Sequence, residues 1–126
     1  MRVKGDGIMR YMAMIFTPDQ EIASAYDQTG LDAEYSRFVR EAQRAGVLAS
    51  HELLQSDDTA TLVQMTDRGT LISDGPQELP DQAARGFCIL DCENLDVAIE
   101  WASRIPHARF GTVEVRPVIE VSEQKS

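Results

Sequence analysis

The sequence lacks any long hydrophobic run. No stretch reaches the about 18 consecutive apolar residues that a membrane-spanning helix needs. Residues 1–8 also lack the apolar core of an export signal. We therefore expect neither membrane insertion nor export, and we expect the protein to lie in the cytoplasm.

Positive charge is also scarce. The 126 residues include 12 Lys and Arg against 21 Asp and Glu, which gives a formal net charge of -9. Nucleic-acid binding depends on clustered basic side chains that contact phosphates, and anionic membrane surfaces attract the same kind of cluster. We therefore expect no direct nucleic-acid partner and no membrane partner.

Cysteine is limited to Cys88 and Cys92, which lie four residues apart in an apolar run. In a strand their Cα atoms would be roughly 13 Å apart, whereas a disulfide needs about 7 Å or less. No further ligands for a metal ion lie nearby in the sequence. The sequence also has no Gly-rich phosphate-binding loop. We expect two reduced, partly buried thiols and neither a metal nor a cofactor.

The residues that are present predict one α+β domain. Apolar runs and helical periodicity predict strands over 10–16, 47–55, 86–90 and 112–119, and helices over 31–45 and 94–105. Gly46 is typical of a helix end, and Asn94 is typical of a helix N-cap. The order of these elements indicates a ferredoxin-like subunit with an antiparallel sheet and two helices on one face.

Residues 59–85 are predicted to add a hairpin and a loop. Apolar segments at 59–65 and 70–72 flank turn residues at 66–69, which is the pattern of a β-hairpin. Residues 74–85 then show no clear period and include two prolines. A connection of that length inside a small domain is more often functional than not.

Two of the predicted strands, 10–16 and 86–90, are apolar on both faces. Two helices can cover only one face of the sheet, so the other face needs a cover that the chain does not supply. The simplest cover is the same face of a second copy. We therefore predict a homodimer whose sheets pack face to face.

The segment Asp74-Gly75-Pro76 is the strongest candidate for a functional site. Gly75 and Pro76 together can hold the Asp74 carboxylate in one position, where it could act as a base or orient a substrate. The alternative is an ordinary turn, in which the Asp side chain bonds the backbone two residues on. Both interpretations stay open, and the turn is the more frequent use of these residues.

Histidine and arginine supply the remaining candidates. His51 is the natural acid or base near neutral pH, although a lone histidine at a strand edge is more often structural. His107 follows a helix end and is expected to be a capping or surface residue. Arg10, Arg85 and Arg109 lie at element ends and could hold an anionic substrate or simply be solvated.

Several motifs together resemble the YCII-related family, DGPF type. The resemblance runs from Met9 to Val118, and it is specific because the order and spacing of the motifs agree. The motifs are Arg10-Tyr11-Met12, Ala45-Gly46-Val47-Leu48, Thr59-Ala60-Thr61, Asp74-Gly75-Pro76, Gly86-Phe87, Ala98-Ile99-Glu100-Trp101-Ala102, Ile105-Pro106 and Gly111-Thr112-Val113-Glu114-Val115-Arg116-Pro117-Val118.

The resemblance implies a dimeric α+β barrel built from ferredoxin-like subunits. The expected domain covers residues 9–121, after an N-terminal extension at 1–8 and before a disordered tail at 122–126. Some relatives of this kind act on small aromatic or lactone substrates, and others are associated with sigma factors. The hypothesis is a cofactor-independent lyase or isomerase-like enzyme on a small organic substrate. The alternatives are a ligand-binding or regulatory module, of the kind associated with a sigma factor, and a structural dimer without a working pocket.

The resemblance also assigns roles to residues. Asp74 and His51 would be catalytic, while Gly75, Pro76, Gln77 and Arg10 would contact the substrate. The chain departs from the family at Gln77, where Phe is usual, and in the residues at 78–81. An amide in place of an aromatic ring makes the expected pocket more polar, so no particular substrate is carried over.

Overall fold

The computed structural model describes residues 7–18, 28–77 and 82–120. The strands are β1 (Met9–Thr17), β2 (Leu48–Leu53), β3 (Thr61–Thr66), β4 (Gly69–Asp74), β5 (Ala83–Cys92) and β6 (Thr112–Pro117). The helices are α2 (Gln28–Arg44) and α3 (Leu95–Ala102), with short 3-10 helices η1 (Asp57–Thr59) and η2 (Pro106–Arg109). The predicted extension and tail lie outside the described residues, apart from Gly7 and Ile8.

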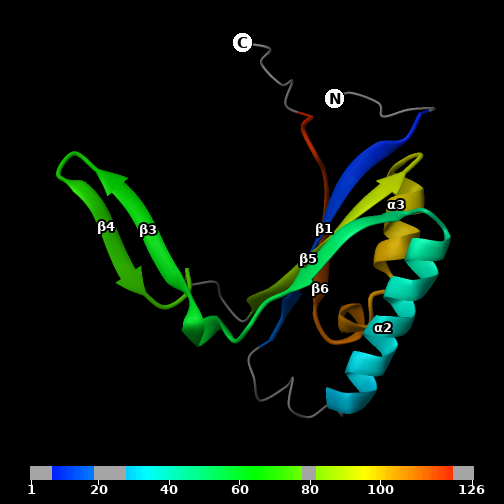
Figure 1. The fold of residues 1–126 in the computed structure, drawn as a ribbon, viewed down its shortest axis with the longest axis horizontal. Helices are drawn as coiled ribbons and strands as arrows, with labels where there is room; N and C mark the ends of the chain where they lie inside the picture. The colour runs from blue at the N-terminus through cyan, green and yellow to red at the C-terminus, as the bar shows by residue number, and fades with distance from the viewer. Residues whose placement is uncertain (1–6, 19–27, 78–81, 121–126) are drawn as a thin grey trace.

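A four-stranded antiparallel sheet forms the body of the molecule, in the order β2-β5-β1-β6. α2 and α3 lie on the same face of this sheet (Figure 1). The order and the antiparallel pairing are those of a ferredoxin-like fold with a hairpin, β3 and β4, inserted between β2 and β5. The predicted fold class is confirmed.

The core lies between the sheet and the helices. Alternate residues of β1 and β5, such as Ala13, Ile15 and Leu90, are buried against this layer. α2 presents Tyr35 and Phe38 to the same layer, because apolar residues recur along its inner side. Burying these alternating faces stabilises the fold and sets which side of each strand faces the helices.

Both predicted helix-end signals hold in the structure. Gly46 has φ +73, a left-handed conformation that glycine adopts without steric cost after a helix. The side chain of Asn94 accepts a hydrogen bond from the backbone N–H of Val97, which satisfies a free donor of the first turn of α3. The local residue chemistry therefore sets the end of α2 and the start of α3.

Several element boundaries differ from the sequence prediction, including the start of α2 at Gln28 rather than Leu31, and two of the differences have a visible cause. β5 begins at Ala83 rather than Gly86, because a bulge between Ile15 and Phe16 lets β1 continue to pair with residues ahead of Gly86. α3 ends at Ala102 rather than Ile105, where the N–H of Ile105 bonds the carbonyl of Ala102 in a tighter 3-10 geometry.

At Gly86, β5 passes close to the backbone of β2. A Cβ atom at this position would collide with the backbone carbonyl oxygen of Glu52 and come within 2.9 Å of the Leu53 side chain. A residue without a side chain is therefore required for the two strands to pair at this point.

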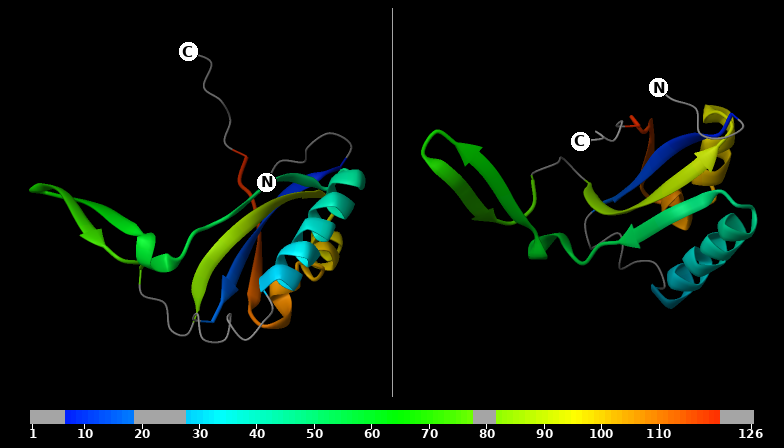
Figure 2. Two further views of the ribbon diagram at one scale, coloured as in Figure 1. Left: turned by 60° about the horizontal axis from the view of Figure 1, so that its bottom comes forward. Right: turned by 45° about the horizontal axis from the view of Figure 1, so that its top comes forward.

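The second face of the sheet, which we call the open face, is not covered by any helix in the described residues. It presents Met12, Met14 and Phe16 from β1, and Phe87 and Ile89 from β5, all partly exposed. The hairpin β3–β4 projects on this side of the sheet, away from α2 and α3, in all the views (Figures 1 and 2). Among the described residues, no helix combines the length and the apolar character needed to cross a membrane.

Candidate functional site

A cleft of about 830 Å³ lies where the chain leaves β2 and where it enters β5. Its described lining comes from the end of β2 and η1 on one side, and from the segments before β5 on the other. The lining residues are Leu54, Gln55, Ser56, Asp57, Thr59, Ala60, Pro76, Gln77, Gln82, Ala83 and Ala84. A volume of this size suits a small organic ligand.

The lining combines apolar walls with a few polar groups. Leu54, Ala60 and Pro76 supply apolar surface, and the amides of Gln55 and Gln77 can both donate and accept hydrogen bonds. Asp57 is the one ionisable side chain in the described lining. The cleft therefore offers one negative charge, hydrogen-bonding amides and a largely apolar surface.

The Asp74-Gly75-Pro76 segment leads into this cleft. The N–H of Gly75 donates to the carbonyl of Ala60 at 2.9 Å, and Gly75 has φ +99, which favours glycine. Pro76 and Gln77 then line the cleft. Asp74 lies two residues before this wall, exposed at the end of β4 and paired with Thr61.

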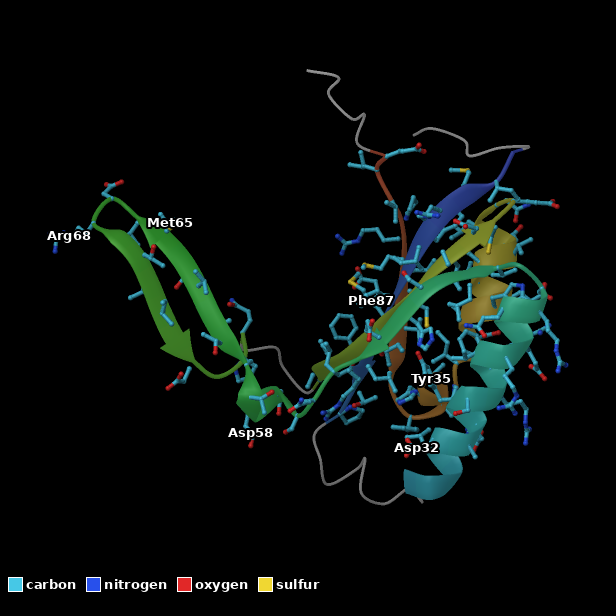
Figure 3. All side chains as sticks on the ribbon, viewed as in Figure 1. Asp32, Tyr35, Asp58, Met65, Arg68 and Phe87 are labelled. Carbon is cyan, nitrogen blue, oxygen red and sulfur yellow. The ribbon has the colours of Figure 1, made fainter. Side chains whose placement is uncertain are left out.

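His51 lies on the helix-covered side of the sheet. It pairs with Cys88 across the β2–β5 ladder, and its Nδ1 lies 3.1 Å from the hydroxyl of Tyr35 on α2. The Tyr35 hydroxyl is also 3.8 Å from the Cys88 sulfur. Figure 3 shows Tyr35 between α2 and the sheet, while Phe87 points to the opposite side. His51 is not among the cleft-lining residues, so in this chain the two predicted catalytic side chains do not meet at the cleft.

Burial keeps the neighbours of His51 in their neutral forms. It raises the pKa of the Cys88 thiol to about 11, against the lowering effect of the Tyr35 hydrogen bond. Burial also raises the pKa of the Tyr35 phenol well above its usual value of 10. Cys92 is likewise free and buried, with a pKa of about 11 because of burial and the adjacent Asp91. The predicted reduced thiols are therefore present, and they are weak nucleophiles.

The three arginines expected to hold an anion each contact a group of their own chain. Arg10 makes a two-point ion pair with Asp91 on the open face, with Nε and Oδ1 at 2.9 Å. Asp91 accordingly raises the pKa of Arg10, chiefly through this hydrogen bond. Arg85 donates to the Thr17 hydroxyl, and Arg109 pairs with Glu34 at 2.7 Å. None of them is among the cleft-lining residues.

Sequence reasoning missed Asp57 and Gln82. Asp57 belongs to a polar run after β2 that carries no recognisable motif, and it reaches the cleft because η1 turns the chain there. Gln82 lines the cleft while its amide donates to the Thr112 hydroxyl at 3.1 Å. Within the described part of the chain, no three His, Cys, Asp or Glu side chains gather in a group that could hold a metal ion.

Comparison with known proteins places this architecture in a family. The family model of the YCII-related domain matches residues 9–122. The chain belongs to the YCII-related family. It is also 28% identical over 116 residues to an uncharacterised protein, R00369, of Rhizobium meliloti (strain 1021). That match covers 87% of this chain and 92% of the relative. The family resemblance expected from the motifs is confirmed.

His107 of this YCII-related chain is buried, so the expected surface or capping role is wrong. η2 folds back under α2, and the His107 ring stands edge-on to Tyr35 at 5.8 Å between centroids. Its Nδ1 is buried and has no hydrogen-bond partner among the described residues. Burial lowers the pKa of His107, assisted by the nearby charges of Arg85 and Arg109 and opposed by Asp32.

His107 makes stability depend on pH. Because its pKa in the folded state is below the unfolded value of about 6.5, the unfolded chain takes up a proton first as the pH falls. We predict that the free energy of unfolding falls from pH 7.5 to pH 5.5, with this residue contributing a slope of at most about 1.4 kcal/mol per pH unit.

Urea unfolding at the two pH values measures the effect. The His107→Phe variant keeps a ring against Tyr35 and Phe110 but cannot be protonated. Its loss of stability at acid pH should be smaller than that of the wild type. An equal loss in both proteins would remove His107 as the cause.

Proposed function

We propose that this YCII-related protein is a homodimer that binds a small organic molecule in the cleft beside η1. The observation that carries the proposal is the cleft itself, about 830 Å³ with apolar walls and few polar groups. Its position next to Pro76 and Gln77 agrees with the substrate-contacting role expected of this segment. Two unpaired buried thiols suit the reducing cytoplasm as its location.

The charge of the cleft favours a cationic or neutral ligand. Asp57 contributes a negative charge to the described lining, and the chain as a whole carries -9. A carboxylate ligand would be repelled, whereas an amine could form a charge-assisted hydrogen bond with Asp57. The amides of Gln55 and Gln77 suit carbonyl and hydroxyl groups of the same ligand.

Asp57→Asn tests the ligand class. A panel of matched small amines, alcohols and carboxylates, such as benzylamine, benzyl alcohol and benzoate, is titrated while backbone NMR shifts are followed. We expect amines to change the backbone NMR shifts of Gln55, Gln77 and Gln82. We expect Asp57→Asn to weaken amine binding by about 10-fold or more. Asp58→Asn, at an exposed neighbour that does not line the cleft, is the control. Shifts absent from these residues for all three compound classes would contradict the proposal.

A second candidate is catalysis on the same ligand. The observation that favours it is the position of Asp74, which is separated by Gly75 from the cleft wall formed by Pro76 and Gln77. Asp74 would serve as base or orienting group in a lyase or isomerase-like reaction without a cofactor. His51, expected as its proton partner, lies outside the described cleft lining and would assist only from a distance. The regulatory alternative, a ligand sensor beside a sigma factor, would use the cleft without turnover.

A measurement of substrate turnover distinguishes catalysis from ligand sensing. We expect a screen of small lactones and chlorinated aromatics to reveal activity that Asp74→Asn lowers by about 100-fold or more. His51→Gln should lower it less, because His51 lies outside the described cleft lining. Asp67→Asn, at the exposed hairpin turn, is the control for a lost carboxylate. Equal rates for wild type and Asp74→Asn would remove Asp74 from the chemistry.

The open face supports the proposed homodimer. Met12, Met14, Phe16, Phe87 and Ile89 form an apolar strip on two neighbouring central strands. An isologous contact would place this strip on its own copy across a two-fold axis. Burial of the two strips provides the driving force for association.

A charge in the centre of the strip should prevent dimerisation. Met14 lies opposite Phe87 on one side and Glu114 on the other. We expect Met14→Glu to raise the dimer dissociation constant by about 100-fold or more, because each copy would bury a further negative charge beside Glu114 at the axis. Light scattering measures the mass, and Ile99→Glu, at an exposed position on α3, is the control. A wild type of 14 kDa at micromolar concentration would contradict the dimer.

A further inference from the structure

The hairpin of β3 and β4, residues 61–74, is here called the arm, and one of its sides is strongly apolar. Val63 pairs with Ile72 and Met65 pairs with Thr70, so these four side chains share one side. Val63 and Ile72 are each 64% exposed, and Met65 is 76% exposed. Large apolar side chains gathered at such exposure indicate a contact surface rather than scattered surface residues.

Within the described residues, the arm has little support from its own chain. Its two strands form a sheet of their own, separate from the four-stranded sheet. The base is closed by the hydrogen bond from Gly75 to Ala60, and the strands otherwise pack extensively only on each other. A two-stranded hairpin is marginal in water, so an arm of this length gains stability when another surface covers it.

The arm and the open face lie on the same side of the molecule. Both are opposite α2 and α3 in the two orientations of Figure 2, and Figure 3 shows Phe87 directed to the side from which Met65 and the arm project. The cleft connects them, because its lining runs from Pro76 and Gln77 to Ala84, which pairs with Phe16. A second copy seated on the open face therefore comes next to the arm.

The open face alone is small compared with the contact area of a standard stable dimer. Four strands spaced about 4.8 Å apart and paired over about six residues cover a flat footprint of roughly 400 Å² per copy. A standard stable interface buries about 800 Å² per partner. The apolar side of each arm, two strands about 20 Å long, has a footprint of roughly 200 Å². By symmetry each copy buries this area on its own arm and a similar area where it receives the arm of the other copy.

We propose that each arm packs its apolar side, formed by Val63, Met65 and Ile72, against the other copy in the dimer. This inference rests on the proposed sheet-to-sheet dimer and extends it to a clasp, in which two arms hold the partner from opposite sides of the two-fold axis. The arm tip carries Asp67 beside Arg68 rather than a basic cluster, which does not favour an anionic membrane surface as the occupant.

Sedimentation equilibrium of the full chain tests the clasp. The double variant Val63→Thr with Ile72→Thr keeps β-branched side chains, and therefore strand propensity, while it removes apolar surface. We expect its dimer dissociation constant to rise by at least about 10-fold. Ile99→Thr, at a position 50% exposed on α3, is the matched control and should stay within about twofold of wild type.

A second measurement reads the arm directly. Met65→Cys adds a thiol to a chain whose own cysteines are buried, so a thiol reagent at pH 8 reports chiefly on the arm. The reaction of Met65→Cys should slow as the protein concentration rises through the dissociation constant of the dimer. Arg68→Cys, at the arm tip, is the reference, and its reaction rate should change less.

The outcomes distinguish the clasp from the sheet-to-sheet dimer on which it rests. A dimeric wild type with an unchanged constant in the double variant, and a Met65→Cys reaction independent of concentration, would overturn the clasp and leave the sheet dimer standing. A wild type that stays monomeric at all concentrations would overturn the sheet dimer, and the clasp with it.

Discussion

One sheet has two faces, and the helices in the described part of the chain cover only one of them. Tyr35 and Phe38 on α2, with their neighbours on α3, bury the inner sides of β1 and β5. The outer sides of the same strands carry Met14, Phe87 and Ile89, which the described helices leave partly exposed. Because side chains alternate along a strand, strands that are apolar on both sides give a sheet that needs a packing partner on each face. The proposed dimer, the clasp of the arms and the place of the cleft at the edge of the open face all depend on this constraint.

Local sequence features predicted most of the fold. Period-two and helical patterns gave the elements in the right order, and Gly46 and Asn94 marked two helix ends correctly. The start of β5 was missed because it depends on a bulge between Ile15 and Phe16 in a strand almost seventy residues away. The end of α3 was missed because Ile105 packs into the core from a 3-10 turn rather than from the helix. Both errors arise where a tertiary contact decides a local conformation.

The candidate site was predictable only in part. Pro76 and Gln77, which the family resemblance singles out, line the cleft, and their contact with a substrate stays a prediction. Asp57 carries no motif, and only the path of η1 brings it to the same cleft. His107 looked like a surface residue because it follows Pro106 at a helix end, yet η2 folds it beneath α2. The path of the chain in space decides which titratable groups lie together, and spacing along the sequence does not predict it.

The surroundings of His51 restrict what that residue can contribute. Burial keeps Tyr35 and Cys88 protonated. The Tyr35 hydroxyl lies within hydrogen-bonding distance of both Nδ1 of His51 and the Cys88 sulfur, and the donor in each contact depends on the tautomer of the imidazole ring. In either tautomer, Nδ1 of His51 is engaged by α2 on the helix-covered side of the sheet, away from the described cleft lining. If the protein is an enzyme, acid–base chemistry at the cleft therefore falls to a carboxylate rather than to His51.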